Sequence, residues 1–143
     1  MPSKRVKERP ASVKLEIDQK KPEVIFDIEF KDGLFFVVIK NIGNSVALKV
    51  IPKLNKRIAG LGGKKDLNKM NLFRGIEYFP PGKEIRFFLD SAPSYFSGKQ
   101  PTQFTVEVSY SDSSGRKFRE KINHNLEIYR DLPYLTKTGS SNE

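Results

Sequence analysis

Hydrophobic and polar residues alternate at every second position through much of the chain between residues 23 and 125. In residues 24–30 the apolar side chains occupy the even positions, charged ones occupy positions 27 and 29, and Ile25 is the one exception. Because successive side chains of a β-strand point to opposite faces, this period predicts strands with one buried face. The strands predicted by alternation or by a short apolar run cover residues 24–30, 34–39, 46–50, 76–78, 85–89, 104–110 and 117–122.

Turn-forming residues separate these strands. Asp32-Gly33 is a hairpin signal between the first two strands, and Asp112-Ser-Ser-Gly115 connects the last two. Pro52 indicates that the third strand ends there or lies at a sheet edge. Residues 55–74 contain three glycines and no clean period, which predicts a long, flexible surface loop, and residues 91–102 are expected to form an irregular connection.

About seven short strands without a convincing amphipathic helix predict an all-β fold, an immunoglobulin-like sandwich of antiparallel strands. We expect this domain to cover residues 23–128. A flexible basic arm is expected at residues 1–22, where Val13, Leu15 and Ile17 alternate and could add an edge strand. Residues 129–143 are expected to form a C-terminal tail.

One stretch resembles a known family. The string Asn41-x-Gly43-x-x-x-Ala47 between two strands, followed by Pro81-Gly82, resembles the CARDB-type (adhesion-related) immunoglobulin-like domains of bacteria and archaea. The hairpin of residues 104–122 also falls where that pattern would place it. The resemblance covers roughly residues 23–125 and implies a seven-stranded sandwich used for contact or spacing, without catalysis.

Composition excludes several kinds of chemistry. The chain has no cysteine and one histidine, which excludes disulfide scaffolds, Cys-ligated metals, thiol nucleophiles and multi-His metal centres. No cofactor, metal site or catalytic residue is therefore expected, and the protein is not expected to be an enzyme. The longest apolar stretch, residues 34–39, is far shorter than the roughly 20 residues that span a bilayer. We expect a cytoplasmic protein or, alternatively, the soluble part of a membrane-anchored or exported parent.

Three motifs invite chemical interpretations. His124 is the only possible imidazole base, but it is expected just past the last strand, solvated or at the core edge. The glycine-rich stretch at residues 60–65 does not fit a phosphate-binding P-loop, although its backbone amides and two lysines could hold an anion weakly. The turn at Asp112 offers too few oxygen ligands for calcium.

Charge is the most informative feature. The 26 basic and 17 acidic residues give a formal net charge of +9, and residues 49–74 hold eight basic residues against one acidic. If that stretch folds over the strand of residues 117–122, the basic surface is continuous and attracts an acidic partner: nucleic acid, an acidic membrane surface or an acidic protein segment. The alternative is that the charge serves solubility only. The anion-binding candidates are Lys53, Lys56, Arg57, Lys64, Lys65, Lys69, Arg74, Lys117, Arg119 and Lys121.

A second candidate surface is apolar. Phe36, Val38 and Phe88 fall on strand faces opposite the predicted core, where residues 55–74 or 129–135 could cover them. Left bare, they would form an interface for a partner protein or a homodimer. The sequence thus favours a non-catalytic binding module that uses its basic residues, with a structural or oligomerisation domain as the alternative.

Overall fold

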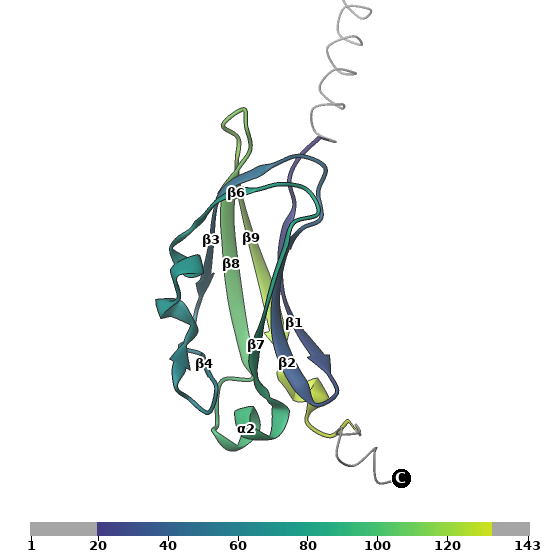
Figure 1. The fold of residues 1–143 in the computed structure, drawn as a ribbon, viewed down its shortest axis with the longest axis vertical. Helices are drawn as coiled ribbons and strands as arrows, with labels where there is room; N and C mark the ends of the chain where they lie inside the picture. Colours follow the sequence, from purple (N-terminus) through teal and green to yellow (C-terminus); the bar gives the residue numbers. More distant parts are fainter. Residues whose placement is uncertain (1–19, 133–143) are drawn as a thin grey trace, which may run out of the picture.

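The computed structural model describes residues 20–132, which form a sandwich of two antiparallel sheets (Figure 1). One sheet has the order β1-β2-β7, with β1 at Val24–Lys31, β2 at Leu34–Asn41 and β7 at Glu84–Ser91. The other has the order β6-β3-β8-β9, with β6 at Ile76–Phe79, β3 at Ala47–Leu54, β8 at Gln103–Ser111 and β9 at Lys117–Asn125. The predicted all-β fold is confirmed, and its immunoglobulin-like assignment stays a prediction.

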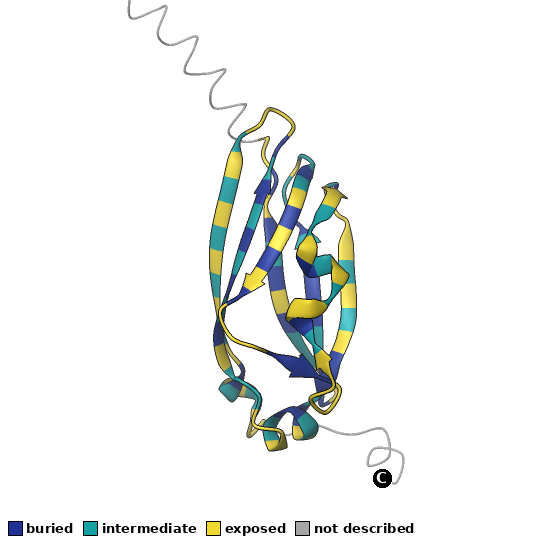
Figure 2. Cartoon of the chain, turned by 90° about the vertical axis from the view of Figure 1, so that its left-hand side faces the viewer, coloured by how far each residue is buried: buried dark blue, intermediate teal, exposed yellow. Residues whose placement is uncertain are grey.

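The core lies between the two sheets. Val24, Phe26 and Ile28 of β1 face inward, as the alternation predicted, and meet Val106 and Val108 of β8 within one buried cluster. Buried and exposed positions consequently alternate as bands along several strands (Figure 2). The Asp32-Gly33 turn closes the β1–β2 hairpin with φ values of 53° and 77°. Positive φ at both positions fits the primed turns that match strand twist.

Strand β3 departs from the predicted pattern. The sequence predicted one apolar face through residues 46, 48 and 50, but the buried positions are Ala47 and Val50. A register shift lies between Leu48 and Ile51, and Lys49 has a φ of 52°. This irregularity, typical of a β-bulge, changes the inward-facing set, which period-2 counting cannot detect.

The expectation that β3 ends at Pro52 is wrong, because the strand continues to Leu54, but its alternative of an edge position holds locally, since Pro52 is paired with β8 on one side only. Asn55 donates its backbone N–H to Thr105 (3.0 Å), so by alternation the position of Pro52 faces away from β8. On that side β6 has already ended, since its last pair with β3 is Val50 with Ile76. The missing N–H of Pro52 therefore breaks no bond between strands.

Residues 55–74 were expected to be a flexible loop, and this is wrong. They form β4 (Ala59–Gly60), β5 (Lys65–Asp66) and two 3₁₀-helices, η1 (Leu67–Lys69) and η2 (Asn71–Arg74), along the β3 side of the sandwich (Figure 1). Ile58, Leu67 and Phe73 are buried in the core. The spacing of these apolar residues in the sequence matches neither a strand nor a helix period, so it predicted no secondary structure. In the structure, each of them fills space between the sheets.

The connection after β7 contains a short helix that was not predicted, α2 (Ala92–Ser97). The Ser91 hydroxyl caps it by accepting the Ser94 N–H (3.2 Å). Tyr95 is fully buried and packs edge-on against Phe35. No helix in the described part of the chain is long and apolar enough to cross a membrane.

The last described element, η3 (Leu126–Tyr129), closes the bottom of the sandwich. The Tyr129 ring stacks on Phe30 with 4.9 Å between ring centroids, so packed structure reaches at least this residue. Arg130 makes two hydrogen bonds to the Glu127 carboxylate (2.7 and 2.8 Å) while its guanidinium lies over the Phe96 ring. Most of the predicted arm, including the alternating residues 13–17, and most of the tail lie outside the described residues.

Replacing Glu127 by glutamine is expected to flatten the acid dependence of stability. Hydrogen bonds from Arg130 and then Thr102 lower the pKa of Glu127 from 4.5 to about 2. A lowered carboxyl pKa stabilises the fold above the unfolded value, and this contribution is lost as the pH falls from 4.5 towards 2. Thermal unfolding followed by circular dichroism across that window measures the effect.

The matched control is Glu77→Gln, which removes an exposed carboxylate that forms no ion pair with the described residues. Its melting temperature should follow that of the natural chain at each pH, whereas that of Glu127→Gln should not. If the melting temperatures of all three proteins fell equally with pH, the role given to Glu127 would be contradicted.

Candidate interaction surface

The outer face of the four-stranded sheet gathers basic residues from distant parts of the chain. Strand pairing places Lys53 of β3 opposite Glu107 of β8, and Glu107 opposite Lys121 of β9. In the next row, Ile51 lies opposite Ser109, and Ser109 opposite Arg119. The cations of β3 and β9 therefore flank the central strand β8.

We call this face the basic face and define it by its exposed cations. Glu107 is the one carboxylate among the outward positions of β3, β8 and β9, and its Oε2 lies 3.7 Å from Arg119 Nε. Glu120 of β9 lies on the other side of the sheet, where it accepts a hydrogen bond from the Tyr110 hydroxyl. The exposed cations of the basic face are Lys49, Lys53, Lys117, Arg119 and Lys121.

Shallow depressions follow β8 across the basic face. One of about 440 Å³ is lined by Lys49, Ser109, Ser111, Lys117 and Arg119, among others. A second, of about 390 Å³, lies between Lys53 and Lys121. Residues of β8, among them Thr105, Glu107 and Ser109, line the depressions between the cations of β3 and β9. An extended ligand can therefore lie along β8 within reach of both rows of cations.

Lys49 is the basic-face residue that the candidate set missed. The sequence did include Lys49 in the basic stretch of residues 49–74. Its position on the sheet, however, depends on the irregularity in β3. With a φ of 52°, it is exposed beside the depression formed with β9. A register shift in one strand thus adds a cation that alternation alone would not place there.

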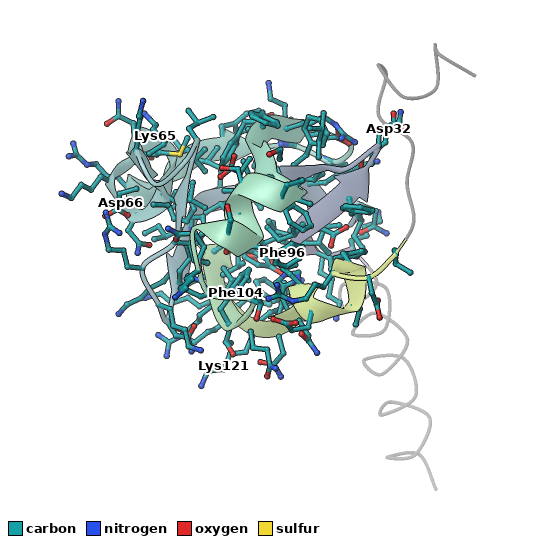
Figure 3. The ribbon with its side chains drawn as sticks, turned by 90° about the horizontal axis from the view of Figure 1, so that it is seen from below. Asp32, Lys65, Asp66, Phe96, Phe104 and Lys121 are labelled. Carbon is teal, nitrogen blue, oxygen red and sulfur yellow. The ribbon has the colours of Figure 1, made fainter. Side chains whose placement is uncertain are left out.

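Most cations of residues 55–74 do not join the basic face. Arg57 is paired with Asp66 (3.2 Å), and Lys64 and Lys65 lie at the β4–β5 turn. Seen from below, Lys65 and Asp66 lie on a different side of the molecule from Lys121 (Figure 3). Lys69 and Arg74 are exposed in the 3₁₀-helices. Since the segment packs beside β3 instead of over β9, the continuous surface expected with it does not form.

Lys56 is the exception in that segment. Its ammonium group donates to the Gln103 carbonyl (2.7 Å), at the start of β8. It lines a third depression together with Thr105 and Asn123. Lys56 therefore extends the basic face at the lower end of β8.

The glycine-rich turn cannot hold an external anion in the way the sequence suggested. Gly62 donates its N–H to the carboxylate of Asp90 (3.1 Å), and Leu61 donates its N–H to the Leu89 carbonyl (2.9 Å). Asp90 is itself buried and also accepts from the Ser94 hydroxyl. The anion that the Gly62 amide holds is therefore a side chain of the same protein, while the Leu61 amide is used by a neutral carbonyl.

His124 lies inside β9, not just past it as expected. Its Nε2 is 2.9 Å from the Phe26 carbonyl oxygen, and its ring packs on Phe104. Since a carbonyl oxygen only accepts, Nε2 carries the proton and donates it. The ring connects the two sheets across their edges, in agreement with the core-edge interpretation.

The Asp112 turn is held by its own residues. The Asp112 carboxylate accepts from the backbone N–H of Ser114 and Arg116 and from Arg116 Nε (2.7 Å). Burial raises the pKa of Asp112, but these hydrogen bonds outweigh it and hold the pKa below its ordinary value. The carboxylate therefore stabilises the turn, as the sequence indicated.

The apolar candidates lie on the outer face of the three-stranded sheet, but the chain itself covers much of them. Arg86 of β7 makes two hydrogen bonds to Glu29 of β1 (2.7 and 3.0 Å), and this ion pair must pass over β2. Val38 is only 6% exposed, while the Phe36 ring packs edge-on against Phe88. Phe88, at 42% exposed, is left as the accessible member of the three.

Comparisons with known proteins place the chain in a family. A comparison with curated proteins found no match. The profile of one family matches residues 4–130, which is most of the chain and includes every described strand. The chain therefore belongs to the family described as "Domain of unknown function (DUF8453)".

Proposed function

We propose that this protein is a non-catalytic binding module that engages an acidic partner through its basic face. The observation that carries the proposal is the gathering of five exposed cations around one carboxylate at the outward positions of β3, β8 and β9. Like charges repel, so an exposed cluster of this kind is retained at some cost unless a ligand neutralises it.

Each cation is expected to contribute little to the binding free energy. The affinity results from the number of cations that act together. An exposed ion pair stabilises a complex by about 0.2–1 kcal/mol, because water and salt screen it. Several such pairs along β8 together produce a measurable affinity that falls as salt rises. The cations neutralise charge and do not by themselves read a sequence.

Titration of the full chain into fluorescein-labelled poly-L-glutamate tests the proposal. We expect saturable binding by fluorescence anisotropy at low salt and much weaker binding at physiological salt. Replacing Lys53, Lys117 and Lys121 by glutamine should weaken binding about tenfold or more, since three exposed ion pairs are lost.

The control replaces Lys31, Lys64 and Lys83 by glutamine, which removes the same charge from exposed positions off the basic face. This variant should bind nearly as well as the natural chain. Equal losses in both variants would show that net charge, and not the basic face, drives binding. Absence of binding at low salt would refute the proposal.

A further inference from the structure

The outer edge of β9 is unpaired within residues 20–132. Leu126 donates its N–H to Thr102, and Asp112 donates its N–H to Arg116, just beyond the two ends of the β8–β9 ladder. Hydrogen-bonded and non-bonded pairs alternate in an antiparallel ladder, so the even-numbered residues of β9 bond β8. The odd-numbered residues, including Lys117, Arg119 and Lys121, therefore point their N–H and C=O groups towards the free edge.

The other sheet edges are shorter or partly covered. The edge of β7 is met by β4, where Leu61 donates its N–H to the Leu89 carbonyl (2.9 Å). On β1, the Phe26 carbonyl accepts from His124. Strand β6 has 4 residues, whereas β9 has 9. Among the described strands, β9 thus offers the longest row of free backbone groups.

The side chains of β9 define what would fit beside it. Its outward positions carry Lys117, Arg119 and Lys121, which recur about 6.8 Å apart because each is two strand positions from the next. Its inward positions include Phe118 and Ile122, which are only partly buried and pack at the rim of the core. A neighbouring strand would bring carboxylates to the first set and apolar side chains to the second.

We propose that β9 takes up an extended acidic polypeptide segment as an additional strand of the sheet. The segment carries carboxylates at alternate positions, facing Lys117, Arg119 and Lys121, and apolar residues between them, covering Phe118 and Ile122. This inference rests on the proposed function and narrows the acidic partner to one class. Backbone hydrogen bonds supply affinity, and the alternate side chains supply selectivity.

Charge disfavours a second copy of β9 as the occupant. Two β9 strands paired edge to edge would bring their three cations together, and like charges opposite one another destabilise a sheet. An acidic strand reverses the sign of the same interactions. The charges of β9 therefore disfavour pairing with a second β9 strand and favour pairing with an acidic strand.

Single-stranded nucleic acid fits the face less well. Such ligands stack their bases on exposed aromatic rings. The Phe79 and Tyr95 rings are fully buried, and the Phe96 ring is covered by Arg130. Tyr78 is 66% exposed, but it lies on β6, at the opposite edge of the sheet from β9.

The test compares short peptides of one composition binding to the full chain, measured by isothermal titration calorimetry. In one peptide, Glu alternates with Val and Thr; in the second, the Glu residues are consecutive. Two further versions of the alternating peptide carry N-methyl groups, either on every Glu or on every intervening residue. Only one of these two sets of amides can face β9, so the methylated versions serve as controls for each other.

We expect the alternating peptide to bind at least tenfold more tightly than the block peptide, and only one methylated version to lose binding. On the protein side, Lys121→Pro should bind at least tenfold more weakly than Lys121→Ala, because both lose the charge but only proline loses an N–H at the free edge. Melting curves establish that both variants fold, and edge strands tolerate proline.

Equal affinity of the alternating, block and both methylated peptides would overturn strand addition while leaving the proposed function intact. Binding of a labelled oligonucleotide with no binding of any peptide would overturn it in favour of nucleic acid. Self-association that Lys121→Pro abolishes, without peptide binding, would identify a second copy as the occupant and also overturn it. If neither the peptides nor poly-L-glutamate bound, both the inference and the proposed function would fail.

Discussion

Replacing Asn41 by alanine should lower the free energy of unfolding by roughly 3 kcal/mol or more. The Asn41 side chain is fully buried, and its amide uses its whole hydrogen-bonding capacity. Its Oδ1 accepts from the N–H groups of Glu23 (3.2 Å) and Gly43 (2.9 Å). Its Nδ2 donates to the carbonyls of Ser45 (3.0 Å) and Phe79 (2.9 Å). Alanine would leave four backbone groups without this partner.

Urea denaturation followed by circular dichroism measures this loss. The control is Asn44→Ala, because Asn44 is exposed and its side chain accepts one hydrogen bond, from Lys21 N–H (2.9 Å). That variant should lose about 1 kcal/mol or less. A similar, small loss in both variants would mean that water replaces Asn41 easily, and its proposed structural role would be wrong.

The hydrogen bonds of Asn41 belong to a structural junction that also accounts for the other two residues of the string Asn41-x-Gly43-x-x-x-Ala47. A Cβ at Gly43 would lie 2.4 Å from the Lys21 carbonyl oxygen, so only glycine allows this close backbone approach. Ala47 is fully buried opposite Phe79, at the start of β3. The three residues hold together the start of β1, the turn after β2 and the end of β6. These roles are structural, and they leave the adhesion-related resemblance a prediction.

Replacing Gly60 by alanine is the second change with a large expected effect. A Cβ at this position would lie 2.2 Å from the Leu89 backbone carbonyl oxygen, and a backbone atom cannot swing away as a side chain can. The substitution would push β4 from the edge of β7 and break the hydrogen bond from Leu61 to Leu89. We expect a loss of about 3 kcal/mol, at the upper end of the usual cost of overpacking.

Gly62→Ala separates the clash from backbone strain in the same turn. Gly62 has a φ of 70°, but a Cβ there would have its nearest neighbour at 4.0 Å, which is an ordinary van der Waals contact and no clash. Alanine at Gly62 should therefore cost about 1–2 kcal/mol, the price of the left-handed conformation alone. Urea denaturation of both variants gives the comparison. If Gly60→Ala cost no more than Gly62→Ala, the close approach of β4 and β7 would not be tight in solution.

The candidate site was only partly predictable from sequence. Charge counting identified the basic excess and the row on β9, and Lys53, Lys117, Arg119 and Lys121 do share one face. A continuous basic surface depended on residues 55–74 folding over the strand of residues 117–122, and this condition is not met, because Ile58, Leu67 and Phe73 anchor the segment in the core. Buried apolar side chains therefore decided where the neighbouring lysines lie. Lys49 was missed because no sequence pattern reveals the register shift between Leu48 and Ile51 that determines its position.

The sequence alone determined that the chain forms strands, where most of the hairpin turns lie, and which face of β1, β7, β8 and β9 is buried. Alternation and turn chemistry are local properties, so they can be counted along the chain. Only the tertiary structure decided that Lys53 lies across Glu107 from Lys121, that Asp90 occupies the glycine turn, and that β9 ends the sheet. These facts depend on pairing between segments far apart in sequence, which burial of the whole core selects and no local pattern encodes.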